Sequence, residues 1–340
     1  MSAKTKKKVS TIQYRYLKTD KLGKAFDLKA VLVDVLGRAS DHAEGVKLGS
    51  QARLRRISLD QEGDVTLLNK ITPEKNWHQP FFCGQLIQLA PGTQLPGLMG
   101  DQAEDTNEFV LENLNLGEGS EIARGVMYFA VCGQHLALIE GQAVRGRVLE
   151  RFLTSFLQRA GELEEHQSIV LPRAIPETKD ARVRNVQKID FTGLKTASDG
   201  DGEAEEDVGS YRDRNEEKLL QMLEIMCSDR SLVDKVIQKI PEGGYLEGLF
   251  SLRIRGAKRR KATLAHQDVE ELVRNADIDE VRLEGDGKSR NGEFFLTRAV
   301  RLTDVGGGLI DPEEAMKAIV GALVQWSADG KIDLQLEEKP

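Results

Sequence analysis

RLRRISLDQEGDVTLLNKI, residues 53–71, alternates apolar and polar side chains on both sides of Glu62 and Gly63. A period of two is typical of a half-buried strand, and glycine favours the tight turn between two strands. The stretch therefore predicts an antiparallel hairpin. Short alternating segments follow it, several of them separated by Gly or Pro: CGQLIQLA (83–90), NEFVLENLNL (107–116), ARGVMYFAVCG (123–133) and QHLALIEG (134–141).

Helical patterns flank these segments. Residues 26–39 and 147–159 carry apolar side chains at the spacing of one helix face. Near the C-terminus, Asp311 is a suitable N-cap, followed by Pro312 and two acids in the first turn, and Gly330 predicts the end of that helix. Because strands and helices are both present without a regular βαβ alternation, the sequence predicts an α+β fold, with mixed or antiparallel sheets flanked by helices.

Two domains are expected in 340 residues, an N-terminal α+β domain over 1–165 and a C-terminal α+β domain over 166–340. The acidic, Gly-rich stretch SDGDGEAEEDVGS, residues 198–210, has almost nothing to bury and is interpreted as a flexible linker in the second domain. That domain also contains a predicted strand over 246–254, a helix over 264–275, and a hairpin of 281–283 with 294–302.

The overall composition limits the function classes. The net charge of −7 argues against nucleic-acid binding by net charge alone, although it allows a local basic surface. The three cysteines are widely spaced and form no CxxC pair, a pattern that favours a reducing cytoplasm over a disulfide framework or a zinc site. The basic N-terminus lacks a following apolar region, so no signal peptide is predicted, and no apolar run is long enough to predict insertion into a membrane.

Catalytic motifs are missing from the sequence. Gly287-Lys288-Ser289 resembles the end of a phosphate-binding loop, but Arg282 occupies the position of its first glycine and a strand pattern follows, so a turn is the better interpretation. Gly306–Gly308 lacks the dinucleotide-binding spacing and is interpreted as a connector. None of the five histidines has metal-ligand spacing. We therefore predict no catalytic residue, no metal site and no cofactor, and a non-enzymatic protein.

The strongest functional signal is a basic row after the predicted strand 246–254. It contains six cations within nine positions and no acid before Asp268: Arg253, Arg255, Lys258, Arg259, Arg260 and Lys261. Such a row suits contact with phosphates, which positions a protein on DNA without reading base sequence. The alternative is a solvated turn paired with Glu270, Glu271 or the acidic stretch. Smaller basic groups occur at Lys4–Lys8, at Arg53–Arg56, and at Arg182, Arg184 and Lys188, and each alone is interpreted as ordinary surface.

The order of elements is similar to that of the RexA-like family of phage superinfection-exclusion proteins. YRYLKTDKLGKAFDLKAVLVDVL (14–36) resembles the family's opening strand, basic turn and first helix, and VKLGSQARLRRISLDQEGDVTLLNKI (46–71) its hairpin. FSLRIRGAKRRKATLAHQDVEELV (250–273) is the best match, with strand, basic turn and helix in the same order. The resemblance covers most of the chain, but this chain is longer and has the acidic stretch 198–210 in addition.

This resemblance implies a fold related to that of the ring-shaped DNA-binding protein RdgC. It also implies a cytoplasmic homodimer that binds DNA without strong sequence preference and acts in phage exclusion beside a membrane effector protein. The family's DNA-contact role is carried only onto the six cations of the basic row. Two other functions stay open: a defence-associated nuclease or nucleotide-processing enzyme, and a protein–protein scaffold whose basic row meets an acidic partner.

Overall fold

The computed structural model describes residues 6–18, 22, 26–40, 43–59, 65–91, 97–98, 121–141, 144–174, 186–197, 245–253, 269–270, 273, 281–285, 288–291, 295–306 and 309–335. The chain divides into two compact units. The first unit comprises Met1–Pro176 together with Phe295–Pro340, and the second comprises Glu177–Phe294. The second unit is thus an insertion in the sequence of the first.

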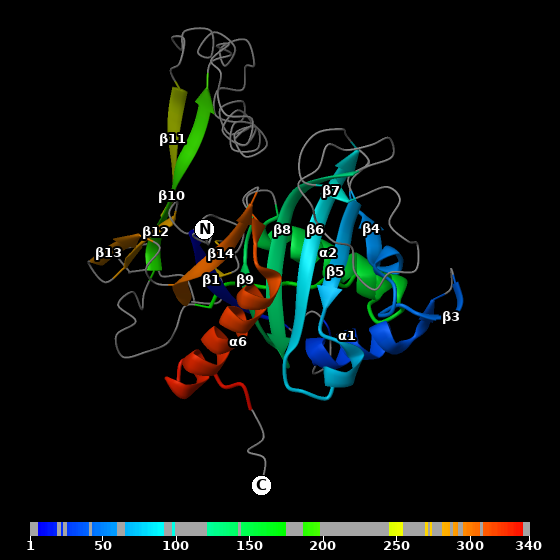
Figure 1. Cartoon of the computed structure of the whole chain (residues 1–340). Coiled ribbons are helices and arrows are strands. Elements are labelled where there is room, and N and C mark those ends of the chain that lie inside the picture. The colour runs from blue at the N-terminus through cyan, green and yellow to red at the C-terminus, as the bar shows by residue number, and fades with distance from the viewer. Residues whose placement is uncertain are drawn as a thin grey trace, which may run out of the picture. The chain divides into compact units, whose positions relative to one another are not determined.

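A nine-stranded sheet forms the first unit, with all neighbouring strands antiparallel and the order β15-β14-β1-β9-β8-β6-β5-β4 (Figure 1). The two-residue strand β7 pairs with β8 beside this path. The strands are β1 (Lys7–Tyr16), β4 (Arg56–Ser58), β5 (Val65–Ile71), β6 (Phe82–Pro91), β7 (Gly97–Leu98), β8 (Glu121–Cys132), β9 (His135–Ile139), β14 (Thr297–Gly306) and β15 (Leu309–Ile310). A separate small pair consists of β2 (Ala39–Ser40) and β3 (Ala43–Lys47), and single 3-10 turns occupy Ala52–Arg55 and Glu74–Asn76.

Both faces of the central strands are buried, and the pleat separates two cores. On β8, Met127, Phe129 and Val131 belong to one apolar cluster, whereas Tyr128, Ala130 and Cys132 belong to the other. The first cluster is completed by helices α1 (Leu28–Gly37) and α2 (Gly146–Arg159), and the second by α6 (Pro312–Ala328). The first unit is therefore a sheet between two helical layers, and Figure 1 shows α6 crossing one of its faces.

The helix ends follow from their capping residues. Asp27 accepts a hydrogen bond from the Ala30 N–H at 2.8 Å at the start of α1. Asp311 accepts one from the Glu314 N–H at 2.7 Å at the start of α6, where Pro312 occupies the first turn. Gly330 follows that helix with a φ of 66°, a left-handed conformation that favours glycine. The start of α6 at Asp311 and its end at Gly330 were predicted from the sequence and are confirmed, whereas the cap at Asp27 was not predicted.

A buried ionic network lies at the N-terminal end of α2. The Glu140 carboxylate is 3.1 Å from an Arg15 guanidinium nitrogen and 3.9 Å from one of Arg173, and these three side chains are 4%, 1% and 3% exposed. It also accepts hydrogen bonds from the Gly146 N–H at 2.7 Å and the Gln13 amide at 3.1 Å. A Cβ at position 146 would lie 2.4 Å from the Arg15 Cζ, so glycine permits the close approach of the guanidinium.

The second unit contains a four-stranded antiparallel sheet in the order β11-β10-β12-β13. Its strands are β10 (Val186–Ala197), β11 (Tyr245–Arg253), β12 (Val281–Gly285) and β13 (Lys288–Asn291). Ile189 pairs with Leu252 on one side and with Leu283 on the other, and Ile189 and Leu283 are buried. Val269, Glu270 and Val273, which are helical, are buried as well, whereas Leu252 is 37% exposed.

The predicted α+β class is confirmed, as are the hairpin of β4 with β5 and the strands corresponding to β6, β8, β9 and β11. The predicted hairpin of 281–283 with 294–302 is wrong. β12 instead pairs with β13, from Arg282↔Asn291 to Gly285↔Lys288, whereas β14 pairs with β1 from Lys7↔Thr303 to Gln13↔Thr297. Alternation in 297–306 predicts a strand but does not specify its partner.

The division into units differs from the predicted boundary between residues 165 and 166. Strand β14 and helix α6 come after the insertion, yet they complete the sheet and the second core of the first unit. The backbone shows how the chain leaves and returns: Tyr16 N–H donates to the Pro172 carbonyl at 3.2 Å, and Tyr14 N–H donates to the Leu296 carbonyl at 3.0 Å. Pro172 and Leu296, which precede and follow the insertion in the sequence, are therefore bonded to neighbouring residues of β1.

Candidate nucleic-acid interface

Of the predicted DNA-contact residues, the structure describes Arg253, the last residue of β11, whose side chain is exposed. Arg255, Lys258, Arg259, Arg260 and Lys261 lie outside the described residues, as do the acidic stretch 198–210 and the basic residues Arg182 and Arg184. The site can be built only from Arg253 and from the strands that neighbour it.

The strand register places a second basic residue beside Arg253. Lys188 of β10 lies directly opposite Arg253 across the β10–β11 pair. Lys188 belongs to a basic group that was interpreted as ordinary surface, and 65 residues separate it from Arg253 in the sequence. Residues opposite each other in an antiparallel pair project to the same face. The structure thus brings together Lys188 and Arg253, which the sequence keeps apart.

The remaining polar residues of this face follow from the same register. Asp190 lies opposite Ser251 on one side and Arg282 on the other, and Lys188 lies opposite Glu284. The polar face therefore consists of Lys188, Asp190, Ser251, Arg253, Arg282 and Glu284, with Ile189, Leu252 and Leu283 projecting to the opposite face. We call these six residues the polar face of the second unit.

Ion pairs organise the centre of the polar face. The Lys188 ammonium lies 2.6 Å from an Asp190 carboxylate oxygen and 3.7 Å from a Glu284 carboxylate oxygen. Burial raises the pKa of Asp190. Hydrogen bonds from Lys188 and Ser251 and the charges of Lys188 and Arg282 lower it by a larger amount, so the pKa of Asp190 lies below its usual value. Asp190 is therefore ionised at neutral pH and compensates the like charges of Lys188 and Arg253.

Positive charge predominates at the margins of this face. Arg253 on β11 and Arg282 on β12 flank the central Lys188–Asp190 pair, and both arginines are exposed. Three cations on the face outnumber its two carboxylates. Exposed guanidinium groups on the two strands that flank β10 suit contact with phosphate oxygens. The face can therefore attract a polyanion.

Two other basic groups of the sequence have structural roles. The buried Arg55 guanidinium donates to the backbone carbonyls of Leu68 at 2.7 Å, Gly49 at 2.6 Å and Asn69 at 2.5 Å, so its interpretation as surface is wrong. Lys7 begins β1, and its ammonium lies 2.8 Å from the Glu314 carboxylate. This contact, with hydrogen bonds from Thr303, lowers the pKa of Glu314 to about 2. These residues join elements of the first unit.

The described part of the chain contains neither a metal centre nor a membrane-spanning helix. No group of three or more His, Cys, Asp or Glu residues is arranged to hold a metal ion there. None of the helices in those ranges is long and apolar enough to cross a membrane. The sequence matches no model of a known protein family, and no curated protein matches it significantly.

Proposed function

We propose that the protein is a non-enzymatic homodimer that binds DNA without sequence preference, through the polar face of the second unit and the basic row that continues from Arg253. The observation that supports this most directly is the register that sets Lys188 opposite Arg253, with Arg282 one strand further. The basic row then adds five cations within eight residues of Arg253 along the chain.

The cellular role in this proposal comes from the resemblance to RexA-like proteins. It comprises phage exclusion or another antiviral defence, a cytoplasmic location, and a membrane effector protein as partner. The RexA- and RdgC-like character of the fold belongs to the same proposal. DNA binding is the part that can be tested first, because it has an electrostatic signature of its own.

The test is fluorescence anisotropy with a labelled duplex of random sequence, titrated over a series of salt concentrations. If all six residues of the basic row contact phosphates, the slope of log K against log salt is about −5 for each copy of the chain. Arg253→Ala is expected to reduce the magnitude of this slope by about 0.9. Arg253→Glu and the double variant Arg259→Glu/Arg260→Glu are expected to weaken binding at every salt concentration.

Lys75→Glu provides a matched control, because Lys75 is exposed in the first unit and its reversal changes the net charge by the same amount as Arg253→Glu. Binding that is unaffected by Lys75→Glu and weakened by Arg253→Glu would assign the contact to the polar face. No binding at low salt, or equal affinities in all variants, would contradict the proposal. Binding of acidic proteins by a chain with no affinity for DNA would favour the scaffold function instead.

A further inference from the structure

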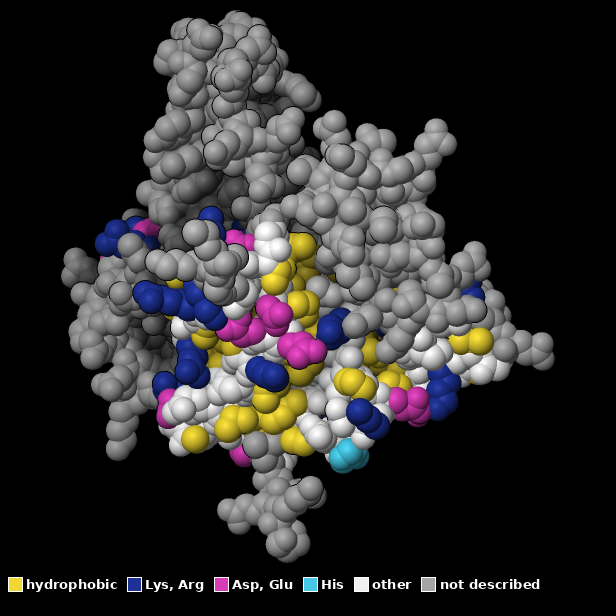
Figure 2. All heavy atoms as spheres, in the orientation of Figure 1, with side chains coloured by type: hydrophobic (Ala, Val, Ile, Leu, Met, Phe, Trp, Pro, Cys, Tyr) yellow, Lys and Arg dark blue, Asp and Glu magenta, His cyan; other side chains and the backbone are white. Residues whose placement is uncertain are grey.

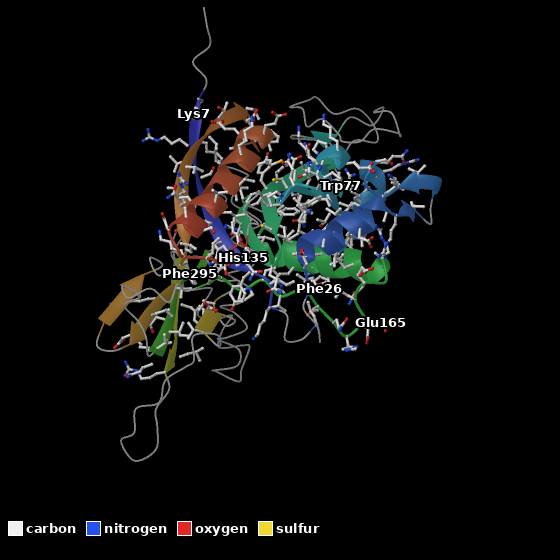
Figure 3. The ribbon with its side chains drawn as sticks, turned by 90° about the horizontal axis from the view of Figure 1, so that it is seen from below. Lys7, Phe26, Trp77, His135, Glu165 and Phe295 are labelled. Carbon is white, nitrogen blue, oxygen red and sulfur yellow. The ribbon has the colours of Figure 1, made fainter. Side chains whose placement is uncertain are left out.

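The outer edge of β14 is open along most of its length in the described structure. β14 is the second strand in the sheet order, and its outer neighbour β15 has two residues, which pair only with Asp304 and Gly306. Within the described ranges, residues 297–302 have β1 as their only strand partner. Figure 3 shows β14 at the outer margin of this part of the sheet, with Lys7 and Phe295 at opposite ends of the β1–β14 pair.

The hydrogen-bond pattern identifies the backbone groups at this edge. Tyr14 N–H donates to the Leu296 carbonyl at 3.0 Å, and Asp304 N–H donates to the Lys6 carbonyl at 2.9 Å. Even-numbered residues of β14 therefore bond to β1, and odd-numbered residues direct their N–H and C=O groups outward. The Thr303 carbonyl confirms this, since it accepts from Asp311 N–H at 3.0 Å on the outer side.

The outward groups of Thr297, Ala299 and Arg301 can thus bond to one further antiparallel strand. Ala299 is exposed, and so are Arg298 and Arg301 beside it. Figure 2 shows Lys and Arg side chains beside this strand, rather than a broad apolar patch. An edge of this kind accepts a strand through main-chain hydrogen bonds, and its side chains decide which strand fits.

We propose that this edge pairs with the same edge of a second copy of the chain, around a two-fold axis at Ala299. Residues 297, 299 and 301 of one copy then oppose residues 301, 299 and 297 of the other, and exchange about six main-chain hydrogen bonds. This interface belongs to the homodimer proposed above, but it does not depend on DNA binding.

Charge and the neighbouring strand select this register among the alternatives. An axis at Arg298 or at Arg301 would set that arginine directly opposite itself, which is unfavourable. An axis at Val300 would set Thr297 opposite Thr303, whose outer side is already occupied by Asp311. With the axis at Ala299, Arg301 lies opposite Thr297 and Arg298 lies opposite Val300. Arg298 meets its own copy only diagonally, where side chains are about 7–8 Å apart.

Complementary charges at position 299 test this register. Ala299→Lys and Ala299→Glu each place like charges directly opposite each other across the axis, and each is expected to weaken dimerisation by up to about fivefold. A mixture of the two variants pairs Lys with Glu and is expected to restore the dimer as a heterodimer. Sedimentation velocity on the full-length chain without DNA measures all three samples. Ala30→Lys, at an exposed position of α1, is the control and is expected to leave dimerisation unchanged.

The inference is overturned if the wild-type chain is a monomer throughout the micromolar range. It is also overturned if both variants dimerise like wild type, or if mixing them restores nothing. A wild-type dimer that fails to bind DNA would contradict the proposed function and leave this interface in place. A monomer that binds DNA would contradict this interface and leave the proposed DNA binding in place. The two failures are therefore distinguishable.

Discussion

Replacing Glu140 with glutamine is expected to be among the most destabilising single changes in the first unit. The carboxylate is the counter-ion of two buried guanidinium groups, those of Arg15 and Arg173, and Arg145 lies 3.6 Å away as a third cation. Glutamine keeps the shape of the side chain and an acceptor for the Gly146 N–H, so the substitution removes mainly the charge. Removing one partner of a buried ion pair costs about 3–5 kcal/mol, because the other partner stays buried and uncompensated.

The chain has a built-in reporter for this measurement. Its two tryptophans, Trp77 and Trp326, both lie in the first unit, so urea unfolding followed by tryptophan fluorescence reports on that unit. We expect the free energy of unfolding of Glu140→Gln to fall by about 3–5 kcal/mol at pH 7. In a unit of this size, each kcal/mol corresponds to a decrease in Tm of about 2–4 °C. Glu74→Gln is the control, because the exposed Lys47–Glu74 pair contributes at most about 1 kcal/mol.

The effect of Glu140→Gln also has a defined pH dependence. Burial raises the pKa of Glu140, but Arg15, Arg173, the Gly146 N–H and Arg145 together lower it below its ordinary value. The unfolded state therefore takes up this proton first as the pH falls. The stabilisation by the carboxylate is complete above the unfolded pKa near 4.5 and is lost as the pH falls through the lower folded value. If Glu140→Gln costs no more than Glu74→Gln at pH 7, the carboxylate is not the buried counter-ion that we describe.

Three further predictions concern other parts of the first unit. Burial lowers the pKa of His135, although a hydrogen bond and the charge of Asp333 oppose this shift. The contribution of neutral His135 to the stability of the fold should therefore decrease as the pH falls below the unfolded pKa of about 6.5. His135→Gln should accordingly reduce the change in urea midpoint between pH 7 and pH 5. Gly321→Ala should raise the free energy of unfolding by about 0.5–1 kcal/mol, because a Cβ there meets nothing within 4 Å and alanine favours the helix interior; a decrease would show that the outer side of α6 is covered. Burial raises the pKa of Cys83 to about 11. The Cys227→Ser variant keeps only Cys83 and Cys132. This variant should resist thiol labelling at pH 8 when folded and should react after unfolding in urea.

Local patterns in the sequence predict the elements of this fold well. The alternation in 123–133 predicts β8, and the cap at Asp311 with the apolar spacing that follows predicts α6. These features are encoded within ten to twenty residues, because side-chain periodicity and capping depend on neighbours in the chain. Side chains on a strand alternate between its two faces. Once both faces of β8 are known to be covered, this alternation also assigns its residues to two distinct cores.

Strand partners are much harder to predict. The segment 297–306 alternates like any half-exposed strand, and its partner β1 lies about 290 residues away in the sequence. The buried arginines present the same difficulty. Arg15 and Arg55 look like surface residues because their partners, a carboxylate at 140 and carbonyls on neighbouring strands, are specified only by the tertiary structure. The pairing of Lys188 with Arg253 could not be found from the sequence for the same reason.

The two proposed surfaces lie in different units, and this makes their coupling measurable. The polar face belongs to the inserted second unit, whereas the β14 edge belongs to the first. Ala299→Lys alters no cation of the polar face, so each monomer it produces should keep the phosphate contacts of one copy. A dimer that engages one duplex with both copies has twice as many contacts. The magnitude of the salt slope should therefore fall roughly by half when the dimer dissociates. Arg253→Glu should leave the mass of the dimer unchanged. If Ala299→Lys gives a monomer with an unchanged slope, each copy binds DNA alone and dimerisation serves another purpose.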